Sequence, residues 1–174
     1  LLALWTGDGS GYQIAQTQPM KLAAVEGLYE GGTNVGLVGI GMLNPEKKTY
    51  NDGKDPFLFR IEIPSMLSFL AERDVDGYVP GITNIIEGGY QLKDGTTALS
   101  AAEKIERGKT AIGALAAYRA AKSAGHEEDA AVAYQVLQEN MPYFGYGYIK
   151  DVNQLVPNVP LNFYAFRIMV ILGG

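Results

Sequence analysis

The chain lacks cysteine altogether and has a single histidine among its 174 residues. The absence of cysteine excludes disulfides, cysteine-ligated metals and thiol catalysis, although it does not identify a cellular compartment. The one histidine, His126, lies in a polar segment between two predicted helices, where we expect it to be solvated. We therefore expect neither a zinc or iron site held by this chain's own residues nor a Ser-His-Asp triad.

The chain also has no basic run and no long apolar run. Its net charge is −5, which argues against nucleic-acid binding and against electrostatic attraction to anionic lipid. Apolar residues gather at positions 1–5 and 163–172, but a membrane-crossing helix needs roughly 18 to 20 residues. Neither end has the basic flank of a signal peptide. Taken alone, these ends indicate a terminal strand or helix packed on a core.

Glycine is abundant, with 22 residues or about 13% of the chain against a usual value of about 7%. This content predicts many turns and an irregular architecture in one domain that is large enough to bury a core. The glycines of residues 7–11 and 36–41 lack dinucleotide-binding spacing, so we interpret them as turns. Residues 74–77 lack the remaining oxygen ligands of a calcium loop.

Periodicity predicts short strands in the first half and helices in the second. Residues 57–63 alternate apolar and polar side chains most clearly, and residues 33–42 do so loosely. A short helix is expected over 65–72. Ser100 begins a capping box before an Ala-rich helix that Gly125 ends, and helix formers resume over 127–139, which predicts an antiparallel helical hairpin. The predicted class is α+β, mainly α.

A short amphipathic helix is expected to carry Lys21 and Glu26, five residues apart, and to continue until Gly31. At about 100° per residue the two side chains diverge by roughly 140°, so they do not form a helical ion pair. They flank an apolar strip that could hold a flat apolar molecule with oxygens at its edge. On geometry alone, the alternative of a solvated rim is stronger. The strip consists of Leu22, Val25 and Tyr29.

Four stretches of sequence, in order, resemble one known loop. Residues 7–12 (GDGSGY), with Gln18 and residues 21–26 (KLAAVE), closely resemble the start of the quinol-binding loop in subunit I of cytochrome bd quinol oxidases. The later stretches are 59–64 (FRIEIP), 144–148 (FGYGY) and 164–170 (YAFRIMV). The resemblance covers nearly the whole chain. Residues 92–140 match least specifically, so no function is carried over to them.

The resemblance implies a quinol site on the first half of the chain. Lys21 and Glu26 match the loop's quinol-binding Lys and Glu, and Asp8 and Gln18 match nearby polar positions of the same pocket. These residue types suit the chemistry, because a carboxylate can accept a quinol proton and a cation can hold the oxygen as its charge changes.

The resemblance also implies haem b as the electron acceptor, with one His and one Met as axial ligands. The matching methionine is Met169, and Arg167 matches a position beside that haem. Without the resemblance, Met169 would be interpreted as a packing residue. The His ligand is not in this chain, so the isolated fragment is expected to be free of haem; the intact oxidase carries further haems.

The expected function is therefore that of an extracytoplasmic loop of a terminal oxidase in the bacterial cytoplasmic membrane. Such an oxidase takes electrons from ubiquinol or menaquinol and reduces oxygen to water. Residues 1–174 would form one domain, with 1–6 and 163–174 as stubs of flanking membrane helices. The remaining helices of subunit I and oxidase subunit II would be its partners, and the fragment alone would be inactive. The alternative is a non-catalytic extracytoplasmic binding domain that engages a partner through its Gly- and Tyr-rich segments.

Overall fold

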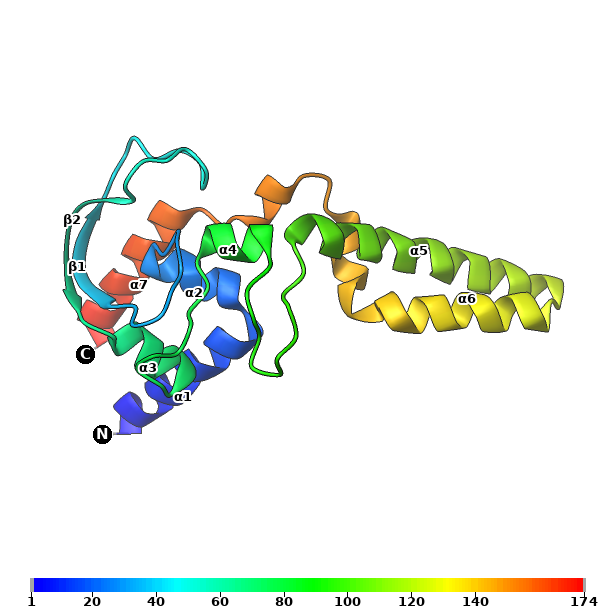
Figure 1. The fold of residues 1–174 in the computed structure, drawn as a ribbon, viewed down its shortest axis with the longest axis horizontal. Helices are drawn as coiled ribbons and strands as arrows, with labels where there is room; N and C mark the ends of the chain where they lie inside the picture. The colour runs from blue at the N-terminus through cyan, green and yellow to red at the C-terminus, as the bar shows by residue number, and fades with distance from the viewer. Residues whose placement is uncertain (1, 174) are drawn as a thin grey trace. The chain divides into compact units, whose positions relative to one another are not determined.

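The computed structural model describes residues 2–173, and within helix α1 the side chains of residues 2–8 and 10 lie outside that description. The chain divides into two compact units, Leu1–Ile85 with Val156–Gly174 and Ile86–Leu155. Helices dominate the described residues, and one two-stranded sheet accompanies them (Figure 1). The predicted class, α+β and mainly α, is confirmed.

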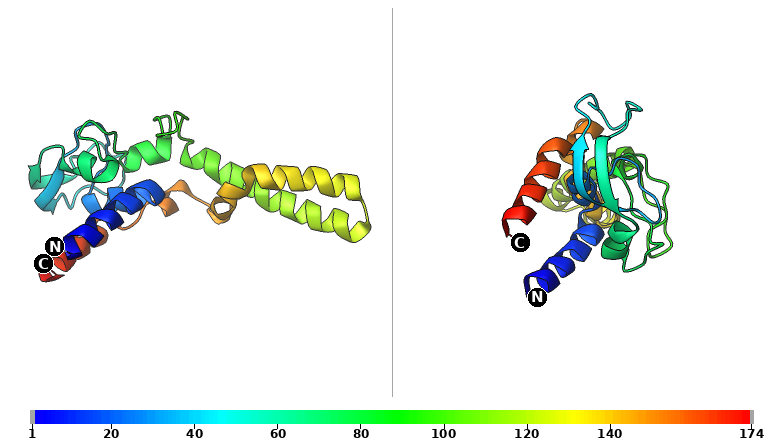
Figure 2. Two further views of the ribbon diagram at one scale, coloured as in Figure 1. Left: turned by 90° about the horizontal axis from the view of Figure 1, so that it is seen from below. Right: turned by 90° about the vertical axis from the view of Figure 1, so that its left-hand side faces the viewer.

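The first unit combines short helices with the sheet (Figure 2). Its strands pair antiparallel, and the strand predicted over 57–63 is confirmed at the expected bounds. Register shifts interrupt the pairing at Gly39 and Leu58, where one strand carries an extra residue. The elements are α1 (Leu2–Thr17), α2 (Pro19–Glu26), β1 (Leu37–Leu43), β2 (Phe57–Ile63), α3 (Met66–Glu72), α4 (Ile82–Glu87, which reaches the boundary of the second unit) and α7 (Val159–Gly173).

Helix α2 ends earlier than the sequence predicted. Gly27 has a φ of 65°, the left-handed conformation in which glycine commonly ends helices, so the helical period does not continue to Gly31. A Cβ at Gly27 would lie 3.0 Å from the Phe57 ring and 3.3 Å from Phe163, so the end of α2 is packed closely on the core. Phe163 is fully buried, and its ring meets that of Phe57 edge-on at 5.5 Å between centroids.

The turns expected among residues 7–11 are absent, because this segment lies within α1. Glycine is a poor helix former, so tertiary contacts must contribute to the stability of this helix. One such contact is visible: Gln16 Nε2 donates a 3.0 Å hydrogen bond to the carbonyl of Ala71 in α3. Helix α4 was not predicted at all, since a helix of six residues carries little periodic signal.

The second unit is built on the predicted helical hairpin, formed by α5 (Ala101–Ala124) and α6 (Glu127–Asn140) (Figure 1). The capping box at Ser100 and Glu103 is present. Ala111, Ala114 and Leu137 form the buried contact between the helices. Two 3₁₀ helices follow, η1 (Met141–Tyr148) and η2 (Val152–Leu155).

The contact between α5 and η1 depends on two glycines. A Cβ at Gly108 would overlap the backbone of Gly147, whereas Gly113, in the same helix, has open space around its Cβ position. We expect Gly108→Ala to lower the melting temperature of the chain because the two backbones must separate. Gly113→Ala should instead stabilise it by about 0.5–1 kcal/mol, the ordinary gain in helix propensity. Thermal unfolding followed by circular dichroism measures both, and equal shifts would contradict the close packing.

Among the described residues, one helical stretch is long and apolar enough to cross a membrane by length and composition. It covers residues 152–173, with a mean hydropathy of 1.5 and only 11% of its most apolar window buried. From sequence, the apolar run over residues 163–172 was judged too short to cross a membrane, because residues 152–162 were not counted with it. The assignment of residues 1–6 and 163–174 as stubs of membrane helices remains a prediction.

Candidate functional site

Glu26, the last residue of α2, points into the first unit. Its side chain is 5% exposed. The Oε2 atom accepts a hydrogen bond from Arg167 Nη2 at 3.0 Å, and the two side chains form an ion pair. The two residues lie 141 positions apart in the sequence. The structure therefore pairs Glu26, which was predicted for the quinol site, with Arg167, which was predicted to lie beside the haem.

Arg167 joins three elements around that carboxylate. Its Nη1 donates to the carbonyl of Val25 in α2 at 2.8 Å, and its Nη2 also donates to the carbonyl of Val38 in β1 at 2.7 Å. The guanidinium lies 3.5 Å from the ring centroid of Phe163, one turn earlier in α7. Because these contacts fix the planar guanidinium from several sides, Glu26 is held against a rigid cation.

The buried position changes the acidity of Glu26. Desolvation raises the pKa of its carboxyl above the usual value, and the charge of Arg167 only partly opposes this effect. A raised pKa brings a carboxylate closer to the range in which it accepts a proton at neutral pH. Glu26 is therefore not the solvated rim charge of the alternative interpretation.

Lys21 is exposed on the same helix, so the predicted divergence of the two charges is confirmed. Leu22 and Val25 lie half-buried between them. Tyr29 is not on the helical strip, because α2 ends at Gly27. The apolar strip is thus shorter than predicted, and Tyr29 lies in the loop that follows α2.

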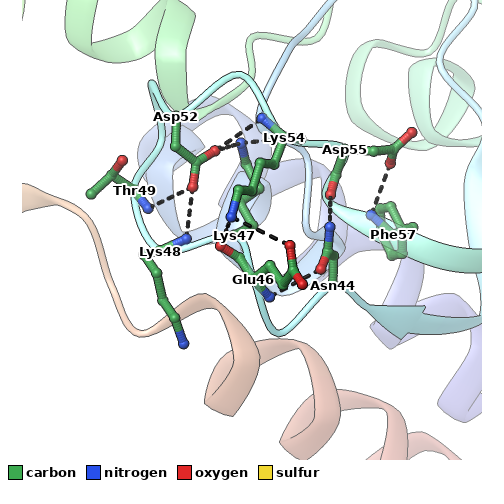
Figure 3. A network of polar contacts seen from close by, with 9 residues as sticks. All are labelled: Asn44, Glu46, Lys47, Lys48, Thr49, Asp52, Lys54, Asp55 and Phe57. Carbon is green, nitrogen blue, oxygen red and sulfur yellow. Dashed lines mark hydrogen bonds and ion pairs between the residues drawn. The ribbon is translucent and has the colours of Figure 1, made fainter.

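The loop after β1 forms a polar network around Lys47, which the sequence did not single out (Figure 3). Lys47 Nζ donates to Asp52 Oδ1 at 2.8 Å and to the carbonyl of Lys54 at 2.9 Å. The Lys47 side chain is 5% exposed, and its Nζ lies 4.5 Å from the ring centroid of Tyr29. The sequence of this loop gives no local signal that distinguishes a buried lysine from a solvated one.

Asp52 accepts the other hydrogen bonds that close this loop. Its Oδ2 accepts from the backbone N–H groups of Lys48 at 2.7 Å and Thr49 at 3.2 Å, and its Oδ1 accepts from that of Lys54 at 3.1 Å. Together with Lys47, which has the largest effect, these donors hold the pKa of Asp52 well below its usual range. A lowered pKa stabilises the fold above the unfolded-state value of about 4, and that contribution is lost only in stronger acid.

We expect Lys47→Met to loosen this loop, because Asp52 loses its charged partner while the apolar stem is retained. The amides of Lys48, Thr49 and Lys54 should exchange with solvent about tenfold faster at neutral pH, since each depends on the Asp52 carboxylate. Hydrogen exchange measured at these amides checks this, with Lys48→Met as the control because the Lys48 side chain is exposed. Unchanged exchange in Lys47→Met would contradict the role of the ion pair.

The remaining predicted pocket residues are less informative. Gln18 precedes α2 at its N-cap position and is exposed, without a capping hydrogen bond from its side chain. The side chain of Asp8 lies outside the described residues. His126 is exposed, as expected, at the junction of α5 and α6. Among the described residues no group of three or more His, Cys, Asp or Glu side chains could hold a metal ion.

Met169 lies on the outer side of α7, with its side chain 60% exposed. Two residues apart in a helix correspond to about 200°, so Arg167 points into the unit while Met169 points away from it. The neighbours Ile168 and Leu172 are exposed as well, and Leu172 lies nearer to the Met169 side of the helix than to the Arg167 side, so this side is apolar. An accessible thioether in an apolar surrounding fits one axial position of a haem, but Arg167 does not face the same side.

Comparisons with known proteins show the family to which this chain belongs. The family model for cytochrome bd terminal oxidase subunit I matches residues 1–174. The chain is 30% identical over 185 aligned residues to the cytochrome bd-II ubiquinol oxidase subunit 1 of Escherichia coli (strain K12), covering 98% of this chain and 32% of that protein. It thus spans about one third of the length of this curated relative.

A solved structure, that of bd oxidase from Geobacillus thermodenitrificans, is also similar. It is 19% identical, with a TM-score of 0.39, and the match covers 98% of this chain and 42% of that one. The family assignment depends on the family model and on the sequence relative, which both extend over essentially the whole chain. The chain belongs to the cytochrome bd terminal oxidase subunit I family.

Proposed function

We propose that this chain is the extracytoplasmic quinol-oxidising loop of a bacterial cytochrome bd oxidase. The observation that carries the proposal is the buried carboxylate of Glu26, joined to Arg167 of α7 at 3.0 Å. The E. coli relative is named as a ubiquinol oxidase. The sequence motifs around Lys21 and Glu26 resemble the quinol-binding loop of that family. The site thus has a proton acceptor where the family's substrate would require one.

Glu26 accepts a proton from the bound quinol in this proposal. Oxidation of a quinol to a quinone releases two electrons and two protons, so a base near one hydroxyl lowers the barrier. Burial supports this role because it raises the pKa of the carboxyl and excludes competing water. Arg167 is a positioning residue, since its contacts with Val25 and Val38 fix the guanidinium that holds Glu26.

Lys21 takes the second oxygen of the quinol. The two oxygens of a 1,4-quinol lie at opposite ends of the ring, so two groups that diverge on one helix can each contact one of them. The half-buried Leu22 and Val25 lie between these groups and offer apolar contact to the ring. This arrangement gives a reason for the five-residue spacing, which is unsuited to an ion pair.

A haem b held through Met169, with a histidine supplied by the rest of the subunit, would provide the electron acceptor. Met169 and Arg167 share helix α7, so the residue that holds Glu26 and the residue that would ligate the haem lie within one turn. The electrons would continue through further haems to oxygen, which is reduced to water. Oxidase subunit II and the remaining helices of subunit I would be partners at the outer face of the cytoplasmic membrane.

Substitution of Lys21 in the intact oxidase tests the binding role. Lys21→Gln should raise the KM for quinol about tenfold or more, because a charge-assisted hydrogen bond to the substrate oxygen is lost. Lys48→Gln removes a lysine that is also exposed, from a loop outside the strip, and should leave the KM unchanged. Equal KM values in both variants would remove Lys21 from the substrate site.

A further inference from the structure

The sheet of the first unit exposes one entirely apolar side. Ile40 pairs with Ile61, and Met42 pairs with Phe59, so their side chains form two adjacent rows on the same side. Ile63 continues the row on β2. Each of these five side chains is at least half exposed. We call Ile40, Met42, Phe59, Ile61 and Ile63 the hairpin face.

The hairpin face carries no charge, although charged residues are available in the same strand. Arg60 and Glu62 alternate with Phe59, Ile61 and Ile63, and their side chains pair with each other at 3.5 Å. An exposed side of an antiparallel sheet is normally polar, so a continuous apolar row indicates a surface that a partner covers.

Away from the hairpin face, the hairpin already contacts helix α7. The backbone N–H of Leu43 donates to the Tyr164 hydroxyl at 3.0 Å, and the carbonyl of Val38 accepts from Arg167. Phe57 packs against Phe163. The hairpin is therefore held by helix α7, and the hairpin face remains available for a second contact.

Lipid is a poor occupant of this face. The sheet has two strands, so β2 has a strand partner on one side only and its outer edge keeps backbone groups without strand partners. In hydrocarbon such groups cost several kcal/mol each, and open sheet edges facing lipid do not occur there. The charges of Arg60 and Glu62 would also have to approach the bilayer. A protein surface that covers the face and leaves the edge wet avoids both costs.

We propose that the hairpin face binds an uncharged apolar helix surface of the same subunit, in the part of its length that lies beyond these 174 residues. The chain covers 32% of its E. coli relative, so about two thirds of such a subunit is available to supply that surface. The hairpin is fixed to α7, which lies in the one described stretch that is long and apolar enough to cross a membrane. Docking would hold the loop against the membrane part of its own chain. This inference does not depend on the quinol site.

Thiol labelling of the intact, full-length oxidase tests whether the face is covered. Ile40→Cys should react at least about tenfold more slowly with a polar maleimide than Glu46→Cys, which lies in the loop that joins the same two strands. The chain itself contains no cysteine, and any elsewhere in the complex are replaced first. Equal labelling rates would overturn the proposal, because they would show that water reaches the hairpin face.

A photoreactive phenylalanine analogue in place of Phe59 identifies the occupant. This exchange keeps an aromatic ring at the position, so folding is disturbed little. The expected product is a crosslink within subunit I, to an apolar helix outside residues 1–174. A crosslink to lipid, to another subunit or to a second copy of subunit I would overturn the proposal, and so would a failure to crosslink in an assembled oxidase.

Discussion

In the intact oxidase, Glu26→Gln is expected to slow quinol oxidation at least about 100-fold, the range usual for loss of a general base. Glutamine keeps the shape of the side chain and can still accept a hydrogen bond from Arg167, but it cannot accept the quinol proton. Oxygen reduction driven by an artificial electron donor that bypasses the quinol site should change far less. Steady-state rates with both donors measure the difference.

Glu30→Gln is the matched control for this substitution. It makes the same chemical change four residues later, at an exposed position, and should leave both rates near their original values. Loss of the carboxylate also leaves the Arg167 guanidinium buried without its anion, which can destabilise the protein. The double variant Glu26→Gln with Arg167→Gln removes both charges, and it should assemble while still failing to oxidise quinol. Equal loss of both activities in assembled Glu26→Gln would instead indicate damage to the haems.

The second large effect is expected at Met169. Met169→Leu in the intact oxidase should abolish or shift the spectrum of the low-spin haem b, because leucine keeps the volume of methionine but cannot bind iron. Quinol oxidation should fall with it, while the rest of the loop remains folded, since the side chain is mostly exposed and contributes little to the core. Reduced-minus-oxidised difference spectra of the purified complex check this.

Met141→Leu is the control, because Met141 is similarly exposed but lies in η1 of the second unit. Its spectrum should match that of the unsubstituted protein. An unchanged haem b spectrum in correctly assembled Met169→Leu would remove Met169 from the haem site and leave it as a surface methionine.

Local patterns predicted those parts of the fold whose signal lies within a few residues. The alternation of residues 57–63 gave the bounds of β2, and the capping box at Ser100 gave the start of α5. The end of α2 was misplaced because two glycine signals competed, and only packing against Phe57 and Phe163 selects Gly27 over Gly31. Helix α1 was missed because its glycines oppose helix formation locally, and contacts such as that of Gln16 with α3 cannot be inferred from sequence.

The candidate site was also predicted only in part, because sequence patterns report features that lie within a few residues. The types and spacing of Lys21 and Glu26 were visible in the sequence, and so was their divergence. The pairing of Glu26 with Arg167 was not, because it joins residues 141 positions apart and depends on how α7 packs on α2 and β1. The burial of Lys47 was equally invisible, since a lysine in a charged loop is solvated in most proteins.

A structure of the intact oxidase with a bound quinone analogue would show where the quinol ring binds. We predict that the ring lies against Leu22 and Val25 of α2, with one oxygen within about 3.2 Å of a Glu26 carboxylate oxygen and the other near Lys21. Glu26 should remain paired with Arg167 in that complex. A quinone ring bound elsewhere, with α2 unoccupied and Glu26 out of reach of either oxygen, would contradict a quinol site on α2.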